Sequence, residues 1–299
     1  MCLEQARTLK TAGTKYVVIT PVRDEEEHIS STIESMVRQT LLPEEWVIVD
    51  DGSRDGTGRI IDEYASRYPW IKVVHRLDRG FRKSGGGVVD AFNDGYRILG
   101  CSDWDFIVKF DGDLTFEPTY FEASIEEFRI DPSLGVGGGV ISYVENGQKR
   151  FEQAQSFHVR GATKIYRKPC WKMIGGLLSA PGWDTFDEIK ATSLGWTTRS
   201  FPHLHLIHQR DTGAADGVWR SLVKYGRANY ICGYHPLFMF FKCVRRIGKK
   251  PYLLGSIGLM CGFVSGYLKR VPQVDDPAAI KYIRGQQVSR LLGRASIWK

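Results

Sequence analysis

Short apolar, β-branched runs alternate with segments of helical periodicity through the first 110 residues, and this alternation limits the fold more than any other feature. Strands are predicted at 16–21, 46–50, 71–75 and 105–110. Their nearly continuous apolar character is typical of strands that are buried on both faces of a parallel sheet. A βαβαβαβ order gives such a sheet right-handed crossovers, and ligands collect at the carboxyl ends of its strands. We therefore predict an α/β fold.

The second half of the chain is less regular. A strand is predicted at 136–144, and a short helix at 189–194 that Gly195 ends. Asp276 and Pro277 are predicted to cap a final amphipathic helix. One face of that helix would carry Ile280, Ile283, Gln287 and Leu291.

Polar clusters follow each of the first four predicted strands, at 21–25, 50–53, 79–87 and 111–113. In the last cluster, a single glycine separates Asp111 from Asp113. Two carboxylates on such a turn suit a divalent cation that also binds phosphate oxygens. A solvated Asp-Gly turn explains this tripeptide alone equally well.

Taken together, these clusters resemble glycosyltransferase family 2 over about residues 15–210. The resemblance is carried by Thr-Pro-Val-Arg-Asp-Glu-Glu at 20–26, Val-Ile-Val-Asp-Asp-Gly-Ser-Arg-Asp-Gly-Thr at 47–57 and Lys-Phe-Asp-Gly-Asp at 109–113. It implies the Rossmann-like GT-A fold, a nucleotide-sugar donor, a divalent metal (Mn²⁺ or Mg²⁺) and inversion at the anomeric carbon. The catalytic domain would cover residues 1–215, with the donor half at about 15–113 and the acceptor half at about 114–215.

The resemblance also assigns roles to individual residues. Asp113 would be the direct metal ligand, Asp111 would lie near the ribose and the metal, and His208 would complete the metal or diphosphate site. Asp51 would face the nucleotide base, because a carboxylate accepts from an imide or amide N–H. The nucleotide-sugar site as a whole would comprise Pro21, Arg23, Glu25, Asp51, Arg79, Gly86, Asp111 and Gly112. By contrast, Glu26 and Glu27 are interpreted as an acidic first turn of the following helix.

A general base must take the proton of the acceptor hydroxyl. The family places its catalytic Asp 11 residues before a glycine, and Asp184 stands at that interval from Gly195. Trp183 replaces the acid that usually precedes it. Glu188 is the second candidate, and Asp187 the third. Asp184 also fits a helix N-cap with Asp187 as its partner, and Trp183 fits either a sugar-stacking or a core residue.

The net charge of +7 is unevenly distributed. Between Asp216 and Asp275 the chain has ten Lys and Arg residues and no acidic residue, so this segment carries +10 and the remainder −3. It also contains the apolar runs 236–241 and 251–268. We therefore predict that the helical region 216–299 associates with an anionic membrane surface. Nucleic acid is disfavoured because no recognition motif accompanies the charge.

The uncharged run 252–268 has 17 residues, including four glycines, and is at the short limit for crossing a bilayer. It is interpreted as interfacial or re-entrant; the alternative is a pair of buried helices that close the catalytic domain. The N-terminus lacks a basic stretch followed by an apolar one, and the six cysteines show no CxxC spacing. These features predict a peripheral or monotopic protein on the cytoplasmic face of the membrane.

The predicted acceptor is a lipid-linked saccharide used in surface polysaccharide or glycoconjugate assembly. A polyprenyl-phosphate monosaccharide transferase and a non-catalytic, nucleotide-binding membrane scaffold are alternatives. A nucleotidyltransferase is disfavoured because the loop 22–26 is too acidic to hold a triphosphate. Processive family members carry Gln-x-x-Arg-Trp, whereas Leu291 follows Gln287-Val-Ser-Arg290 here.

Overall fold

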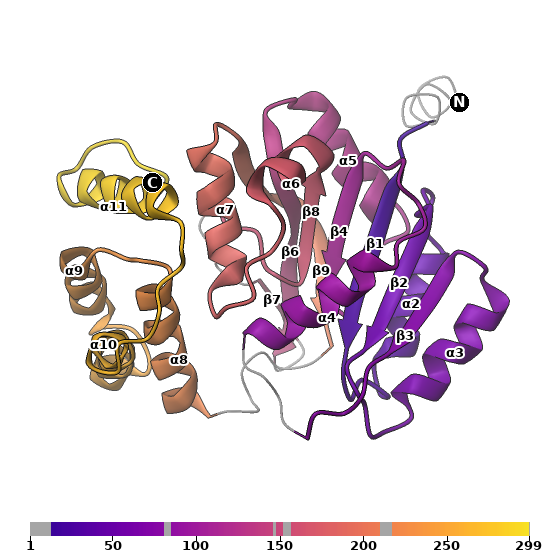
Figure 1. The fold of residues 1–299 in the computed structure, drawn as a ribbon, viewed down its shortest axis with the longest axis horizontal. Helices are drawn as coiled ribbons and strands as arrows, with labels where there is room; N and C mark the ends of the chain where they lie inside the picture. The colour runs from indigo at the N-terminus through magenta and orange to yellow at the C-terminus, as the bar shows by residue number, and fades with distance from the viewer. Residues whose placement is uncertain (1–12, 81–84, 146–147, 152–156, 210–216, 299) are drawn as a thin grey trace.

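A computed structural model describes residues 13–298, except 81–84, 146–147, 152–156 and 210–216. Within these residues, one mixed sheet lies between helices, and further helices gather at one end of the molecule (Figure 1). The strands are β1 (Tyr16–Val22), β2 (Glu45–Asp50), β3 (Ile71–His75), β4 (Phe106–Phe110), β5 (Leu114–Phe116), β6 (Leu134–Glu145), β7 (Gln148–Phe151), β8 (Thr163–Arg167) and β9 (Thr197–His208). The helices are α2 (Ile29–Val37), α3 (Thr57–Arg67), α4 (Gly86–Arg97), α5 (Tyr120–Ile130), α6 (Lys168–Ile174), α7 (Trp183–Ser193), α8 (Val218–Ile231), α9 (Pro236–Arg246), α10 (Tyr252–Leu268) and α11 (Pro277–Leu291).

The predicted parallel half of the sheet is confirmed. Strand β1 pairs in parallel with β2 and β4, and β2 with β3. Every residue of β2 and β4 is buried, which explains why these runs show no polar alternation. Glu45, a buried acid in β2, is stabilised by a 2.8 Å ion pair with Lys72 and by the amides of Gly100 and Cys101.

The other half of the sheet is mixed, and the full order is β3-β2-β1-β4-β8-β6-β9-β5. The strand predicted at 136–144 lies within β6, which pairs in parallel with β9 and antiparallel with β8. After Asp113, the short strand β5 carries the chain away from β4 to pair with β9, with Leu114 opposite His208. This connection brings the end of β9 to the carboxyl end of β4.

Two hydrophobic cores cover the two faces of the sheet. One contains apolar residues of α2, α3 and α5, such as Ile33, Ile61 and Phe121. The other contains residues of α4, α6 and α7, such as Phe92 and Trp171. In Figure 1, α4 crosses in front of the strands. The first half of the chain is therefore a layered α/β structure, as predicted.

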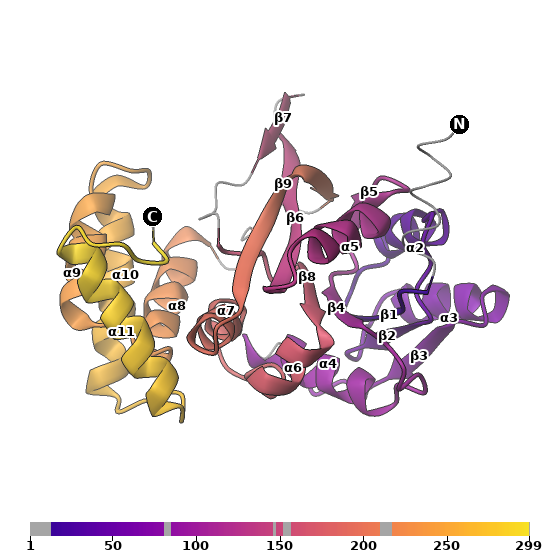
Figure 2. The ribbon, with the colours of Figure 1, turned by 90° about the horizontal axis from the view of Figure 1, so that it is seen from above.

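The helices α8 to α11 form a third core together with α7. Phe186 and Ile189 of α7 pack with Tyr230, Phe263 and Ile283, among others, of the C-terminal helices. In both views, α7 lies between the sheet and these helices (Figures 1 and 2). The C-terminal helices therefore support the same helix that carries the candidate base.

Three local predictions about helices are corrected. The helix predicted at 189–194 begins at Trp183, and its N-cap is Gly182, so Asp184 is the second helical residue and not a cap. Helix α2 begins at Ile29 without acidic residues in its first turn. Glu26 instead accepts a 3.0 Å hydrogen bond from the amide of Gly56, at the start of α3.

The predicted start of the last helix is confirmed, because Asp276 Oδ1 accepts from the amide of Ala279 at 3.0 Å. Ile283 and Gln287 are buried on the predicted face. The five cysteines among the described residues are free thiols. Among the described residues, we find no helix whose length and apolar content suffice to cross a membrane.

Candidate active site

Asp111, Asp113 and His208 converge at the carboxyl end of β4. One potential ligand atom from each lies within 4.8 Å of the others, and His208 Nε2 lies 3.2 Å from Asp113 Oδ2. The pairing of β5 with β9 brings them together, reinforced by a 2.9 Å hydrogen bond from Gln209 N to Asp113 O. The side chains of Asp113 and His208 are nearly buried, whereas that of Asp111 is 31% exposed.

Tight packing of Gly112 fixes the turn that carries the two aspartates. A Cβ atom on Gly112 would lie 2.5 Å from Val22 Cγ1, so a side chain does not fit there without a shift of β1. The hydroxyl of Thr32 donates to Gly112 O at 2.8 Å and accepts from Leu114 N at 3.0 Å. The turn is thus anchored to α2 on both sides of Asp113.

The chemistry of this cluster fits a divalent cation. Carboxylate oxygens and an imidazole nitrogen are ligands that Mn²⁺ accepts, and the partial exposure of Asp111 leaves an approach from solvent. Asp111 also forms an ion pair with Lys109, a buried residue that sequence reasoning missed. Lys109 was missed because it occupies an apolar strand. Only the ion pair with Asp111 explains why its positive charge can be buried there.

Asp51 directly follows β2 and is held by arginines. Its two carboxylate oxygens accept from Arg76 and Arg79, and Arg23 Nη1 donates to its backbone oxygen at 2.9 Å. The structure thus brings Arg23, Asp51 and Arg79 together as predicted. It adds Arg76, which follows β3 directly, so its position at a strand end was the available signal.

A second missed residue, Asp78, closes this arginine cluster. Hydrogen bonds from the amide of Gly80 and from the side chains of Arg23 and Arg54 hold the pKa of Asp78 well below its usual range. The carboxylate therefore stays charged and keeps both arginines in place.

Pro21, Glu25 and Gly86 were also predicted to bind the donor, and each lies at or near the end of a secondary-structure element. Pro21 lies in β1 opposite Val49. Glu25 is buried, and its backbone connects two helices: its amide donates to Thr57 Oγ1 at 2.8 Å, and its carbonyl accepts from Ile29 N. Gly86 is the buried first residue of α4. Residues 81–84 of the predicted glycine-rich loop lie outside the described residues.

Asp187 and Glu188 are buried and fully engaged, which argues against their predicted role as bases. Lys164, itself 0% exposed, donates to Asp187 at 2.8 Å and to Glu188 at 2.8 Å. Tyr166 donates to Asp187, and the amide of Val159 donates to Glu188 at 2.7 Å. An acceptor hydroxyl cannot reach these carboxylates without displacing the buried network.

Asp184 is the remaining candidate base, and its side chain is only partly buried. Two neighbouring residues connect it to the aspartate turn. A Cβ on Gly161 would lie 3.2 Å from Asp184 Cβ, and the next carbonyl, that of Ala162, accepts from Asp111 N at 3.0 Å. Asp184 and the cluster of Asp111, Asp113 and His208, called the cation cluster below, therefore both lie near the same short stretch of backbone.

Trp183, beside the candidate base, belongs to the core. It is 6% exposed, and the ammonium groups of Lys109 and Lys164 lie 5.5 and 5.8 Å from its ring. This burial favours the core interpretation over stacking against a sugar.

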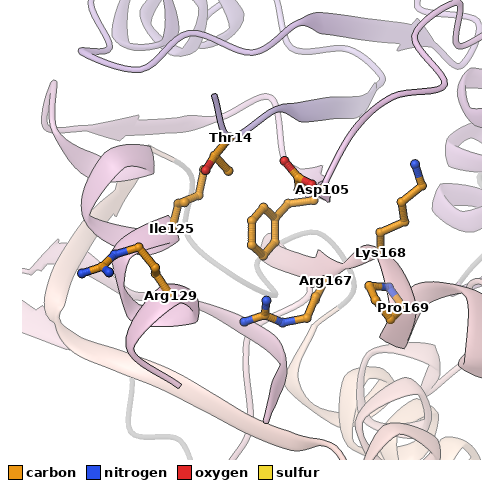
Figure 3. Close-up of a pocket in the computed structure, with 8 residues that line it drawn as sticks. Thr14, Asp105, Ile125, Arg129, Arg167, Lys168 and Pro169 are labelled. Atoms are coloured by element: carbon orange, nitrogen blue, oxygen red, sulfur yellow. The ribbon is translucent and has the colours of Figure 1, made fainter. Parts of the chain in front are cut away.

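A hollow of about 440 Å³ lies at the other end of the sheet, beside the amino end of β4 (Figure 3). Its cationic side chains are engaged within the chain: Arg167 donates to Leu134 O at 2.9 Å, and Lys168 to Ser102 O at 2.8 Å. It lies away from the cation cluster, and we do not assign it a role in the chemistry.

The chain is similar to several known proteins. The model of the family "Glycosyl transferase family 2" matches residues 17–178. The uncharacterized glycosyltransferase EpsJ of Bacillus subtilis is 32% identical over 110 residues, which is 37% of this chain and 29% of EpsJ. The chain thus matches less than a third of the length of that relative.

Solved structures share the fold. The mannosyltransferase PcManGT from Pyrobaculum calidifontis, solved in complex with GDP-Man and Mn²⁺, superposes with a TM-score of 0.55 at 15% identity, covering 92% of this chain and 80% of that one. GalNAc-T7 with UDP, GalNAc and Mn²⁺ gives 0.60 at 13% identity, covering 94% and 57%. The predicted GT-A fold is confirmed.

Proposed function

The chain belongs to glycosyl transferase family 2, as its motifs predict, and from this premise we propose that it is a metal-dependent, inverting glycosyltransferase. It would move a sugar from a nucleoside-diphosphate sugar to an acceptor hydroxyl. One observation carries the proposal: Asp184 and the turn that carries Asp111 both border residues 161–162, so the candidate base lies near the cluster of Asp111, Asp113 and His208. Donor phosphates and an acceptor hydroxyl can thus meet between them.

The donor nucleotide would bind beside Asp51. Its carboxylate oxygens have about four lone-pair positions, so a base N–H can bind while Arg76 and Arg79 keep the side chain oriented. Arg23, Glu25, Pro21 and Gly86 would shape the same side of the site. This arrangement suits a base with an imide or amide N–H, and both uracil and guanine meet that requirement.

Asp113 and His208 would hold the cation, with Asp111 close to both the cation and the ribose. Two structural neighbours, PcManGT and GalNAc-T7, contain Mn²⁺, which supports this assignment. A divalent cation at this position would neutralise the negative charge of the departing nucleoside diphosphate.

Asp184 would act as the general base. It accepts the proton of the acceptor hydroxyl while that oxygen bonds to the anomeric carbon, from the face opposite the diphosphate. The bond from the anomeric carbon to the diphosphate oxygen breaks in the same step, so the configuration inverts. Lys164 donates a hydrogen bond to the backbone oxygen of Asp184, which fixes the start of α7.

We propose a lipid-linked saccharide as the acceptor, on the cytoplasmic face of the membrane, because residues 217–274 combine ten basic residues with long apolar runs. A polyprenyl-phosphate monosaccharide transferase is the second candidate. The same composition favours it, and it differs only in taking a bare lipid phosphate as acceptor.

A donor and acceptor screen tests this proposal. Thermal shift should show stabilisation by one class of UDP-, GDP- or TDP-sugar in the presence of Mn²⁺, since a ligand stabilises only the state that binds it. Proton NMR of the product should then show an inverted anomeric configuration. Transfer to polyprenyl phosphate alone would favour the second candidate. Full sugar transfer by both Asp113→Asn and Asp184→Asn would show that neither residue has its proposed role.

A further inference from the structure

Helix α10 has two unlike apolar faces. One carries Gly255, Gly258, Gly262 and Gly266, all buried. A Cβ on Gly262 would lie 2.1 Å from the carbonyl oxygen of Val223 in α8, so the two helices pack backbone to backbone. The glycines predicted to belong to an interfacial segment therefore serve helix packing, in line with the alternative of buried helices.

The opposite face of α10 carries bulky apolar side chains that remain exposed. Leu254 is 62% exposed and Leu268 is 79% exposed. Between them, Ile257 and Val264 are each 41% exposed and lie at helical spacing on the same side. A helix that is apolar all round is ordinarily buried on all sides, but one side of α10 is not covered by the described residues.

Helix α9 adds a second exposed apolar face. Leu237, Phe240, Phe241 and Val244 recur at i, i+3, i+4 and i+7, and each is 43–52% exposed. The opposite side of α9 buries Met239 and Cys243. The two helices are joined by a 2.8 Å hydrogen bond from Ser256 Oγ to Cys243 O. We call these eight exposed side chains of α9 and α10 the outer apolar surface.

Positive charge surrounds this surface. Arg245, Lys249 and Lys250 are exposed at and after the end of α9, and Lys269 and Arg270 are exposed after α10. No Asp or Glu occurs in residues 217–274. Such a combination suits a partner that is anionic at its surface and apolar beneath it. A second copy of this chain fits poorly, because two surfaces of the same sign repel.

We propose that the outer apolar surface docks onto an anionic lipid bilayer, with α9 and α10 at the interface and their basic residues among the headgroups. This proposal rests on the proposed function and deepens it, because the acceptor proposed there is linked to a lipid. It also places the chemistry: α8 packs against α7, where a Cβ on Gly182 would lie 3.4 Å from Ala228 Cβ. A docked protein would hold Asp184 behind α8 and the docked helices α9 and α10.

Vesicle flotation with the full chain tests the proposal. Vesicles containing phosphatidylglycerol should carry the protein upward, and vesicles of phosphatidylcholine alone should carry much less. The triple variant Phe240→Gln/Phe241→Gln/Leu254→Gln removes apolar contacts, and Lys249→Glu/Lys250→Glu reverses charge. Each should weaken binding to anionic vesicles by about tenfold or more. Thermal unfolding checks that both variants remain folded.

The matched control is Leu42→Gln/Ile130→Gln/Met173→Gln, which changes three apolar side chains that are 45–64% exposed elsewhere on the molecule. It should bind vesicles like the wild type. Equal binding by wild type and the Phe240 triple variant would overturn the proposal, and so would a wild-type dimer that this variant dissociates in light scattering. Donor binding, measured by thermal shift, should be unchanged in every variant. If vesicles bind but no sugar nucleotide does, the proposed function fails and the docking surface stands.

Discussion

The molecule contains two groups of acidic side chains that differ in their surroundings. One is partly exposed to solvent, and the other is buried around a lysine. Asp111 and Asp113 converge with His208 at a partly exposed turn that an external cation can approach. Asp187 and Glu188 converge on Lys164, a cation supplied by the chain itself and fully buried. The first group stays partly exposed even though Lys109 pairs with Asp111, whereas the second is enclosed together with its own cation.

The energetics of the buried group follow from its composition. Burial alone lowers the pKa of Lys164, but the charges of Asp187 and Glu188 outweigh that effect and raise it. Burial, together with Asp187, raises the pKa of Tyr166 far above its usual value, so its hydroxyl remains a donor. Such a network stabilises α7 only while every member is present. The comparison teaches that the partner, more than the carboxylate itself, decides which acid can take part in chemistry.

The sharpest test compares the partly buried Asp184 with the buried Asp187 on the same helix. Asp184→Asn should lower kcat by about 10²–10⁴-fold, because the acceptor hydroxyl loses its base, while nucleotide affinity stays unchanged. Asp187→Asn should instead lower the free energy of unfolding. Steady-state kinetics and urea denaturation of both variants distinguish the roles. A normal kcat for Asp184→Asn, with a collapsed kcat for a folded Asp187→Asn, would reverse the assignment.

Removing the internal cation should have the next largest effect. Lys164→Met removes the ammonium group that the two buried carboxylates share, and we expect the free energy of unfolding to fall by about 3–5 kcal/mol. Urea denaturation measures this loss. In the double variant Lys164→Met/Asp187→Asn, the loss should be smaller than the sum of the two single losses. Strict additivity would show that the two residues do not act as a pair.

A smaller effect is expected at the glycine of the cation cluster. Gly112→Ala places a methyl group against Val22, which should cost about 1–3 kcal/mol of unfolding free energy and displace the aspartates, weakening Mn²⁺ binding. Gly285→Ala is the control, since no heavy atom lies within 4 Å of its added Cβ in the middle of α11. That change should be neutral or stabilising by up to about 1 kcal/mol. Equal changes in unfolding free energy and in Mn²⁺ affinity for Gly112→Ala and Gly285→Ala would contradict the packing argument.

The smallest effect concerns His158, which lies 2.9 Å from Glu188. Burial lowers the pKa of His158, but the charge of Glu188 outweighs this, so the folded pKa lies above the ordinary value of 6.5. Its contribution to stability is therefore fully present below pH 6.5 and is lost as the pH rises through the folded pKa. The difference in unfolding free energy between wild type and His158→Gln should be larger at about pH 6 than at about pH 9. A difference independent of pH would exclude a charged His158.

The sequence predicted the strands of the first half of the chain well, for physical reasons. Strands β1, β2 and β4 are buried on both faces, so their apolar runs are continuous, and their polar clusters meet at one edge. His208 was predicted only through the resemblance, and the pairing of β5 with β9 brings it to Asp113.

Other features depend on contacts that are distant along the chain. The spacing to Gly195 selected the segment with Asp184, Asp187 and Glu188, but only packing on Lys164 shows which acids are buried. The early start of α7 depends on Gly182, whose positive φ of 89° is not visible as a sequence pattern.

The most direct test of the account is calorimetric titration of UDP and GDP into the protein, with and without Mn²⁺. We predict that one nucleotide binds to the wild type only when Mn²⁺ is present, and that Asp113→Asn weakens this binding by about tenfold or more. Asp62→Asn, which changes an exposed aspartate on α3, serves as the control and should bind normally. Nucleotide binding by Asp113→Asn with wild-type affinity and wild-type Mn²⁺ dependence would contradict the account.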